Sequence, residues 1–227
     1  ERESLDTVKT QAAEIKKVLF NGQKPEPVKQ APCVKKNEAF KTSGQVQYVA
    51  QNGNFRKKGL EYTGALEILK VILSYDYLWI NLRVKGGAYG CMSGFKRNGE
   101  SFLVSYRDPH LKRTLEVYQG VPDYIRAFEA DEREMTKYII GTISNKDVPR
   151  TPQMQGSISK TAYFSNVTED MLQKERNQIL GAQKEDIQKL AALVEAVLSD
   201  NQICVVGSET AIEKAEDVFM EVKPLIG

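Results

Sequence analysis

Arg83 and Tyr89 are the residues of this sequence whose types and spacing best fit a chemical role. They stand six positions apart, on either side of the pair Gly86-Gly87. A guanidinium and a phenol are both hydrogen-bond donors at neutral pH, so two that converge on one point suit a carbonyl oxygen or an oxyanion. The ordinary alternative is an arginine that caps its own helix and a tyrosine packed on its ring at a rim. Taken alone, the pair fits that structural role more often.

The pair is expected to lie where a helix gives way to a hairpin. Apolar residues at roughly helical spacing predict a helix over about 60–85, and the glycines supply the positive φ that ends helices. Strands over 88–95 and 101–106 should follow, joined by a turn at Arg97-Asn98-Gly99. On this interpretation, Arg83 occupies the last helical turn and Tyr89 the start of the first strand.

The first strand of this hairpin is built mostly from small residues. Such a strand has little side chain with which to fill a core, so another backbone could approach it closely. We expect that backbone to be a peptide. The expected substrate contacts are Gly87, Ala88 and Gly90.

The rest of the chain predicts a leader and one larger domain. A helix over 4–20, ended by Asn21-Gly22, and an extended proline-containing connection over 24–36 predict a linker segment 1–43, followed by an α+β domain 44–227. In that domain we expect strands over 45–50 and 203–206, a long loop over 146–156, and helices over 110–118 (begun by Asp108-Pro109), 124–128, 131–143 (with a capping box at Asp131 and Glu134), 168–180, 187–198 and 209–220. This order favours a mixed or antiparallel sheet with helices packed on one face.

Composition excludes several classes of function. The 227 residues are 41% hydrophobic and 27% charged, which is ordinary for a globular protein. The net charge of +2 gives no reason to expect nucleic acid as a partner, and no apolar run is long enough to span a bilayer. Three cysteines without paired spacing argue against a disulfide framework and a zinc ribbon, and favour a reducing, intracellular setting. The chain begins with Glu1 rather than Met, so we expect a piece of a longer protein.

Metal and nucleophile chemistry are poorly represented in the sequence. His110 is the only histidine, so neither a two-histidine zinc site nor any metal site is expected in this chain. His110 follows a helix-start signal and is expected to be a surface residue, not the base of a triad. The glycine pair follows a helix instead of preceding one, which is the wrong polarity for a phosphate loop.

Three separated segments carry a resemblance to a known family. Residues 82–90 (LRVKGGAYG), 105–109 (SYRDP) and 136–144 (TKYIIGTIS), the last followed by Asp147, Pro149 and Pro152, resemble the C-terminal part of presequence-protease-type enzymes in the pitrilysin (insulinase) family of zinc metallopeptidases. The resemblance runs from about residue 46 to the end. The leader looks like the segment that joins the two halves of such an enzyme.

The resemblance implies a fold and a function. The fold would be the LuxS/metallohydrolase-like α/β sandwich, and two such halves would enclose a chamber for unfolded peptides. Zinc would be held by an H-x-x-E-H helix in the N-terminal half, so this chain alone should hold no metal and be inactive. Arg83 and Tyr89 match the arginine and tyrosine that reach the substrate near the scissile bond, where the tyrosine would help to hold the oxyanion.

Two other functions remain open at this point. The chain could be a non-catalytic structural or docking subunit of the same fold, or a free-standing peptide-binding module that uses the edge of the small-residue strand. The expected partners are the N-terminal half of the protease and an unfolded peptide, without nucleic acid or membrane. The expected location is the bacterial cytoplasm, with the mitochondrial matrix as the alternative.

Overall fold

The computed structural model describes residues 2–19, 34 and 36–226, in two compact units that divide at Val34 and Lys35. The first unit contains helix α1 (Arg2–Leu19), close to the expected helix over 4–20. The apolar residues of α1 are exposed within this unit. The expected stop at Asn21-Gly22, and almost all of the expected connection over 24–36, lie outside the described residues.

The second unit is built on a six-stranded mixed sheet. Its order is β3-β4-β2-β5-β1-β6, with β1 at Glu38–Thr42, β2 at Gln47–Asn54, β3 at Gly90–Phe95, β4 at Glu100–Asp108, β5 at Gln202–Ser208 and β6 at Glu221–Pro224. The neighbours from β3 to β5 are antiparallel, whereas β1 runs parallel to both β5 and β6. The edge strands are therefore β3 and β6.

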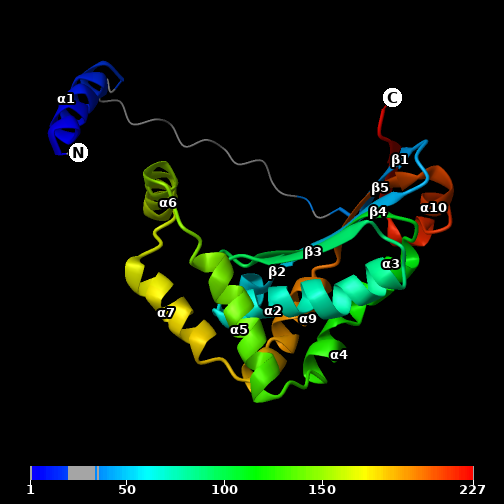
Figure 1. Cartoon of the computed structure of the whole chain (residues 1–227). Coiled ribbons are helices and arrows are strands. Elements are labelled where there is room, and N and C mark those ends of the chain that lie inside the picture. The colour runs from blue at the N-terminus through cyan, green and yellow to red at the C-terminus, as the bar shows by residue number, and fades with distance from the viewer. Residues whose placement is uncertain (1, 20–33, 35, 227) are drawn as a thin grey trace. The chain divides into compact units, whose positions relative to one another are not determined.

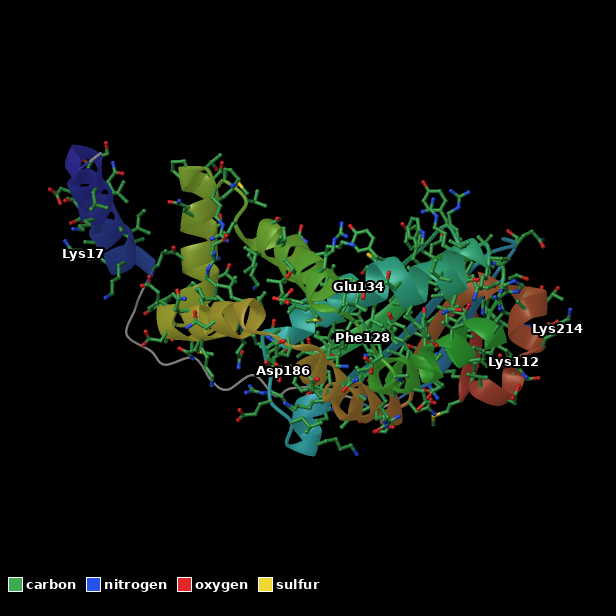
Figure 2. The ribbon with its side chains drawn as sticks, turned by 60° about the horizontal axis from the view of Figure 1, so that its bottom comes forward. Lys17, Lys112, Phe128, Glu134, Asp186 and Lys214 are labelled. Carbon is green, nitrogen blue, oxygen red and sulfur yellow. The ribbon has the colours of Figure 1, made fainter. Side chains whose placement is uncertain are left out.

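Helices pack against one face of this sheet, and the α+β fold expected from the sequence is confirmed (Figure 1). The layer contains α2 (Ala65–Ile72), α3 (Lys112–Gln119), α4 (Val121–Arg126), α5 (Glu132–Lys146), α7 (Glu169–Leu180), α8 (Lys184–Gln188), α9 (Ala191–Ser199) and α10 (Glu209–Glu213). Short 3-10 turns lie at Phe55–Lys58 and Glu216–Val218. Figure 2 views the unit from the helix side, where Phe128 lies among the helices and the charged residues Lys112, Glu134, Asp186 and Lys214 are labelled.

The core lies between the helices and the inner face of the sheet. Alternate residues of β2 and β4 are buried, and α2 contributes Leu66, Ile68, Leu69 and Ile72 to the same core cluster, where it contacts β3 and helices α5, α7 and α8. Helix α9 comes close to β2 at Gly53, where a Cβ would lie 2.1 Å from the carbonyl oxygen of Val197. Only glycine allows the helix backbone to approach the strand this closely.

Several helix signals are confirmed. Asp131 accepts a hydrogen bond from the Glu134 backbone at the start of α5, and the Glu134 side chain accepts one from the Asp131 backbone. Thr168 caps α7 through its side chain. The expected helix over 187–198 is instead two helices, α8 and α9.

Other expectations were wrong. The loop expected over 146–156 contains the start of helix α6 (Pro152–Phe164), which Thr151 caps and a proline begins. The last helix ends at Glu213, and the chain returns to the sheet as β6. Helix α3 begins at Lys112 and not near Pro109, because the Asp108 carboxylate accepts from the His110 backbone and from Thr114 Oγ.

The expected boundary between residues 43 and 44 also differs from the division in the structure. The second unit begins at Lys35, since β1 pairs with β5 and β6 inside its sheet. Strand β1 has five residues, two of them charged, and β6 carries lysine and proline. Such short, charged strands give little alternation in the sequence, although charge and proline are typical of a sheet edge.

A partly buried ion pair links the tip of the hairpin to α7. Arg97 donates to both carboxylate oxygens of Glu175, which is 7% exposed, and the Arg97 guanidinium lies 5.6 Å from the ring centre of Tyr62. We expect Glu175→Gln to lower the free energy of unfolding by about 1–3 kcal/mol, because it leaves a half-buried guanidinium without its charge partner. Urea unfolding would measure this. The exposed Glu169→Gln on the same helix is the control, and equal stability of the two variants would contradict the role of the pair.

Five tyrosines have pKa values raised mainly by burial: Tyr62, Tyr77, Tyr118, Tyr124 (to about 12) and Tyr138. A phenol whose folded pKa is raised contributes stability that is complete below its unfolded pKa of about 10 and falls as the pH rises above it. We therefore expect the urea midpoint to fall steadily above pH 10. Tyrosinate absorbance should rise in a second step that coincides with unfolding. A single step with the fold intact would contradict the burial of these rings.

Candidate functional site

The helix that leads to the candidate site changes its hydrogen-bonding pattern before it ends. After α2 the chain continues as π-helix over Leu73–Tyr77 and Trp79–Val84. The Lys85 backbone N–H donates to the Ile80 oxygen at 2.9 Å, five residues back. Each π turn inserts an extra residue, so the side chains that follow are rotated relative to those of a continuous α-helix. Such turns occur frequently at functional sites.

The turn that joins this helix to β3 is built as the sequence predicts. Gly87 has φ of +79°, which few residues other than glycine adopt without strain. The backbone N–H of Gly87 donates to the Arg83 oxygen, and that of Ala88 donates to the Leu82 oxygen, both at 2.9 Å. These bonds close the helix and direct the chain into the strand, which brings residues 83 and 89 together.

Arg83 and Tyr89 are neighbours on the surface. Arg83 Nη1 donates to the backbone oxygen of Tyr89 at 2.9 Å, and its Cζ lies 5.8 Å from the centre of the Tyr89 ring. Tyr89 is 57% exposed, and within residues 36–226 its hydroxyl makes no hydrogen bond. The phenol and most of the guanidinium N–H groups are therefore available to a ligand.

The cap of this helix comes from another residue. Arg113 on α3 donates to the backbone oxygen of Lys85 at 3.2 Å and to that of Asn81 at 3.5 Å. Arg83 makes its hydrogen bond beyond the helix, to Tyr89. Of the structural alternative, the capping of its own helix by Arg83 is not found, whereas the packing of Tyr89 beside the Arg83 guanidinium is.

The three expected substrate contacts are placed differently from one another. Gly87 is exposed in the turn. Ala88 is 3% exposed and packs in the core, so its side chain does not face a ligand. Gly90 is buried under Tyr106, whose ring atoms lie about 2.4 Å from where a Cβ would be. The Tyr106 ring leaves no room for a side chain at residue 90, and the Phe102 ring likewise leaves none at Gly94. At Gly90 and Gly94, two aromatic rings of β4 therefore account for the small residues without a bound peptide backbone, whereas Gly87 stays exposed.

Sequence reasoning missed three residues beside the pair. The Arg83 guanidinium lies over the Trp79 ring, 4.2 Å from its centre. The Arg107 guanidinium lies 5.3 Å from the centre of the Tyr89 ring, and the Tyr106 ring lies 5.7 Å from it. Trp79 stands four positions before Arg83 on a helix, a spacing that places side chains together, and this signal was available in the sequence.

The sheet face opposite the helices carries an apolar stripe. Its register aligns Met92, Val104, Ala50 and Cys204 in one row, and Tyr48, Val206 and Phe40 in the next. Tyr48 and Met92 are exposed and the others are partly exposed. No helix among the described residues of this unit covers this face (Figure 1). A contiguous apolar surface of this kind is typical of a binding or assembly face.

The described residues offer no metal site. Among residues 2–19, 34 and 36–226, no three His, Cys, Asp or Glu side chains gather so as to hold a metal ion. His110 is exposed in the short connection between β4 and α3. The donor set of this part of the chain therefore does not fit zinc.

Cys91 lies in β3 close to the site, and its thiol is poorly suited to nucleophilic chemistry. Burial raises its pKa to about 11. At pH 8 a thiol with this pKa has about 100-fold less thiolate than one of ordinary pKa near 9, so we expect alkylation of Cys91 by iodoacetamide to be slower by about that factor. Mass spectrometry of the labelled peptides would measure the rate. Urea should restore an ordinary rate, whereas fast labelling of the folded chain would contradict the burial.

Comparison with known proteins decides the family. The family model described as the PreP C-terminal domain matches residues 37–209. The chain belongs to this family. The PreP C-terminal domain of this chain is similar to part of Protein HypA from Clostridium perfringens (strain 13 / Type A), with 49% identity over 192 residues that cover 85% of this chain and 20% of the relative. It is 34% identical over 192 residues to presequence protease 1, chloroplastic/mitochondrial, from Arabidopsis thaliana, covering 83% of this chain and 18% of that protein.

Solved structures show the same fold. Pitrilysin aligns with a TM-score of 0.58 at 19% identity, over 87% of this chain and 22% of that one. The peptidase M16 inactive domain from Pseudomonas fluorescens aligns with a TM-score of 0.59 at 16% identity, over all of this chain and 52% of that one. This PreP C-terminal domain thus has the α+β fold of these structures, and the chain spans about a fifth of the length of the curated relatives. Of the helices that the structure describes, none is both long and apolar enough to cross a membrane.

Proposed function

We propose that this domain forms the substrate-binding wall of a zinc metalloendopeptidase that degrades unfolded peptides in an enclosed chamber. The observation that carries the proposal is the exposed pair Arg83 and Tyr89, next to the edge strand β3 and beside the uncovered apolar face of the sheet. A peptide that is extended and unfolded exposes both carbonyl oxygens and apolar side chains. Arg83 and Tyr89 suit the carbonyl oxygens, and the apolar stripe suits the apolar side chains.

The role of the pair is to donate hydrogen bonds to the peptide backbone. The Arg83 guanidinium keeps N–H groups available after its bond to Tyr89, and the Tyr89 hydroxyl faces solvent. Charge that develops on a carbonyl oxygen is stabilised by donors that are already in place, and a charged donor contributes more than a neutral one. Arg83 would bind and orient the carbonyl, and Tyr89 would add a second donor. Gly87 leaves the turn between them open to the backbone of the substrate.

Zinc in such an enzyme would be held elsewhere. The side chains described here do not fit a zinc site, so the metal would belong to an N-terminal half that precedes this domain in the full-length protein. That half is the proposed partner, and this domain alone should hydrolyse no peptide. The similarity to a bacterial protein and to organellar presequence proteases fits a bacterial cytoplasm or a mitochondrial matrix.

A second function is favoured by one observation. Strand β3 has β4 on one side and, among the described residues, no strand on the other. A peptide could add to this edge through its backbone, which would make the domain a peptide-binding module without catalysis. The same fold could also serve as a docking subunit if the upstream half lacks zinc ligands.

Metal analysis of the full-length protein separates these functions. We expect about one zinc per full-length chain, an H-x-x-E-H motif in the upstream coding sequence, and peptide hydrolysis that a chelator abolishes. This chain purified alone should contain no zinc and show no hydrolysis. A full-length protein that binds no zinc but retains saturable binding of a labelled unstructured peptide would replace the peptidase with the binding module.

A further inference from the structure

Four side chains, alternately aromatic and cationic, lie around the turn between the helix and β3. They are Trp79, Arg83, Tyr89 and Arg107. The Arg83 Cζ lies 4.2 Å from the centre of the Trp79 ring and 5.8 Å from that of Tyr89, and the Arg107 Cζ lies 5.3 Å from the centre of Tyr89. All three distances are within the range in which a cation is attracted to an aromatic ring. The four residues form what we call the turn stack.

Trp79 restricts Arg83. An exposed arginine has many rotamers, and a ligand that binds it must overcome that freedom. Here the guanidinium is fixed at two points, by the Trp79 ring and by the backbone oxygen of Tyr89. Tryptophan is the strongest aromatic partner for a cation, and at 38% exposure its ring is partly shielded from water. The contact therefore prepares Arg83 for binding before a ligand arrives.

Arg107 restricts Tyr89 in a similar way. Its φ of +50° is uncommon for a residue with a side chain, and it lies where the register between β2 and β4 shifts. In this conformation its backbone oxygen accepts from the Tyr89 N–H at 3.3 Å, while its guanidinium lies beside the Tyr89 ring. The Tyr106 ring lies on the same tyrosine. One unusual backbone conformation thus holds Tyr89 by both main chain and side chain.

We propose that Trp79 and Arg107 are positioning residues of the site, Trp79 for the guanidinium of Arg83 and Arg107 for the ring of Tyr89. The inference rests on the proposed function, in which Arg83 and Tyr89 contact the peptide. In this proposal the two positioning residues act through Arg83 and Tyr89 and do not themselves contact the substrate. Tyr75 provides the contrast, because it lies four positions before Trp79, is 70% exposed, and makes no ring contact with a cation among the described residues.

The first test uses the chain itself. Trp79 is the only tryptophan, so the intrinsic fluorescence of the protein reports on this ring alone. Arg83→Ala should increase quenching of Trp79 by acrylamide by about twofold, because the guanidinium no longer covers the ring face. Lys137→Ala on α5 is the matched control and should leave quenching unchanged. Equal quenching of the Arg83→Ala variant and the unmodified chain would overturn the stack.

The second test is kinetic and uses the full-length enzyme. Trp79→Leu keeps an apolar helix-forming residue but removes the ring, so kcat should fall about tenfold with KM changed by less than about twofold. Trp79→Phe restores an aromatic face and should stay within about threefold of the parent enzyme. Arg107→Asn tolerates the left-handed conformation without the guanidinium and should lower kcat by about fivefold. Tyr75→Leu should have no effect.

The outcomes separate this inference from the proposed function. If Arg83→Ala lowers turnover while Trp79→Leu and Trp79→Phe behave alike, the pair binds substrate and the positioning role is overturned. If Arg83→Ala and Tyr89→Phe both leave turnover unchanged, the proposed function fails and the positioning role fails with it. A loss with leucine that phenylalanine restores, at equal thermal stability of both variants, supports positioning by the ring.

Discussion

Replacing Arg83 by alanine, or Tyr89 by phenylalanine, should lower kcat/KM of the proposed full-length peptidase by about 10- to 150-fold. This corresponds to about 1.5–3 kcal/mol of transition-state binding, the range for a lost buried or charge-assisted hydrogen bond. The reason is that both donors are exposed and adjacent, with the Arg83 guanidinium fixed by the Tyr89 oxygen at 2.9 Å. Steady-state kinetics with an unstructured peptide measures the loss.

Two matched variants control for effects on the fold. Arg133→Ala removes an exposed arginine on α5, and Tyr75→Phe removes an exposed phenol in the π-helical stretch. Both should leave kcat/KM within about twofold of the parent enzyme, as expected for surface changes away from a site. If Arg83→Ala and Tyr89→Phe behave like these controls, with melting temperatures unchanged, neither residue takes part in the reaction.

The largest expected effect on stability is that of Leu69→Ala. Leu69 is fully buried in α2, the helix that continues into the π-helical stretch and ends at the site. We expect the free energy of unfolding to fall by about 2–5 kcal/mol, because the change removes buried methyl groups and leaves a cavity. Urea unfolding of the chain measures the loss.

An exposed leucine provides the comparison for this variant. Leu180→Ala, at the end of α7, removes the same atoms from a largely exposed position and should cost less than about 1 kcal/mol. If the two leucine variants unfold at the same urea concentration, α2 does not pack as described. The helix that leads to Arg83 would then not be anchored in the core as the structure shows.

Much of the fold could be predicted from local signals. Positive φ at Gly87, the capping box at Asp131 and Glu134, and the Asn98-Gly99 turn each act within a few residues, so the helix end, the start of α5 and the hairpin were predicted. Strand β1 pairs with β5 and with β6, and both partners lie more than 150 positions further along the chain. The residues of β1 and β6 themselves give little alternation of polar and apolar side chains. The positions of β1 and β6 in the sheet are therefore set by nonlocal pairing, which local sequence patterns do not reveal.

The site was predictable to the same limited extent. The sequence alone predicts that Arg83 and Tyr89 lie close together, because a single glycine turn separates them. The π-helical turns that place Trp79 under Arg83, and the bulge that places Arg107 beside Tyr89, depend on packing between the helix, β3 and β4. Small residues at 90 and 94 suggested a bound peptide, whereas the rings of Tyr106 and Phe102 occupy that space. Cross-strand packing explains the small residues without a ligand.

The most direct test of the central claim is a complementation assay. The upstream half that is proposed to bind zinc and this chain would be purified separately, and hydrolysis of an unstructured peptide measured for each and for their mixture. We predict no hydrolysis by this chain, little by the upstream half, and a large gain on mixing that the Arg83→Ala, Tyr89→Phe double variant does not give. Full activity of the upstream half alone, or an equal gain with the double variant, would contradict the claim that this domain supplies donors to the substrate.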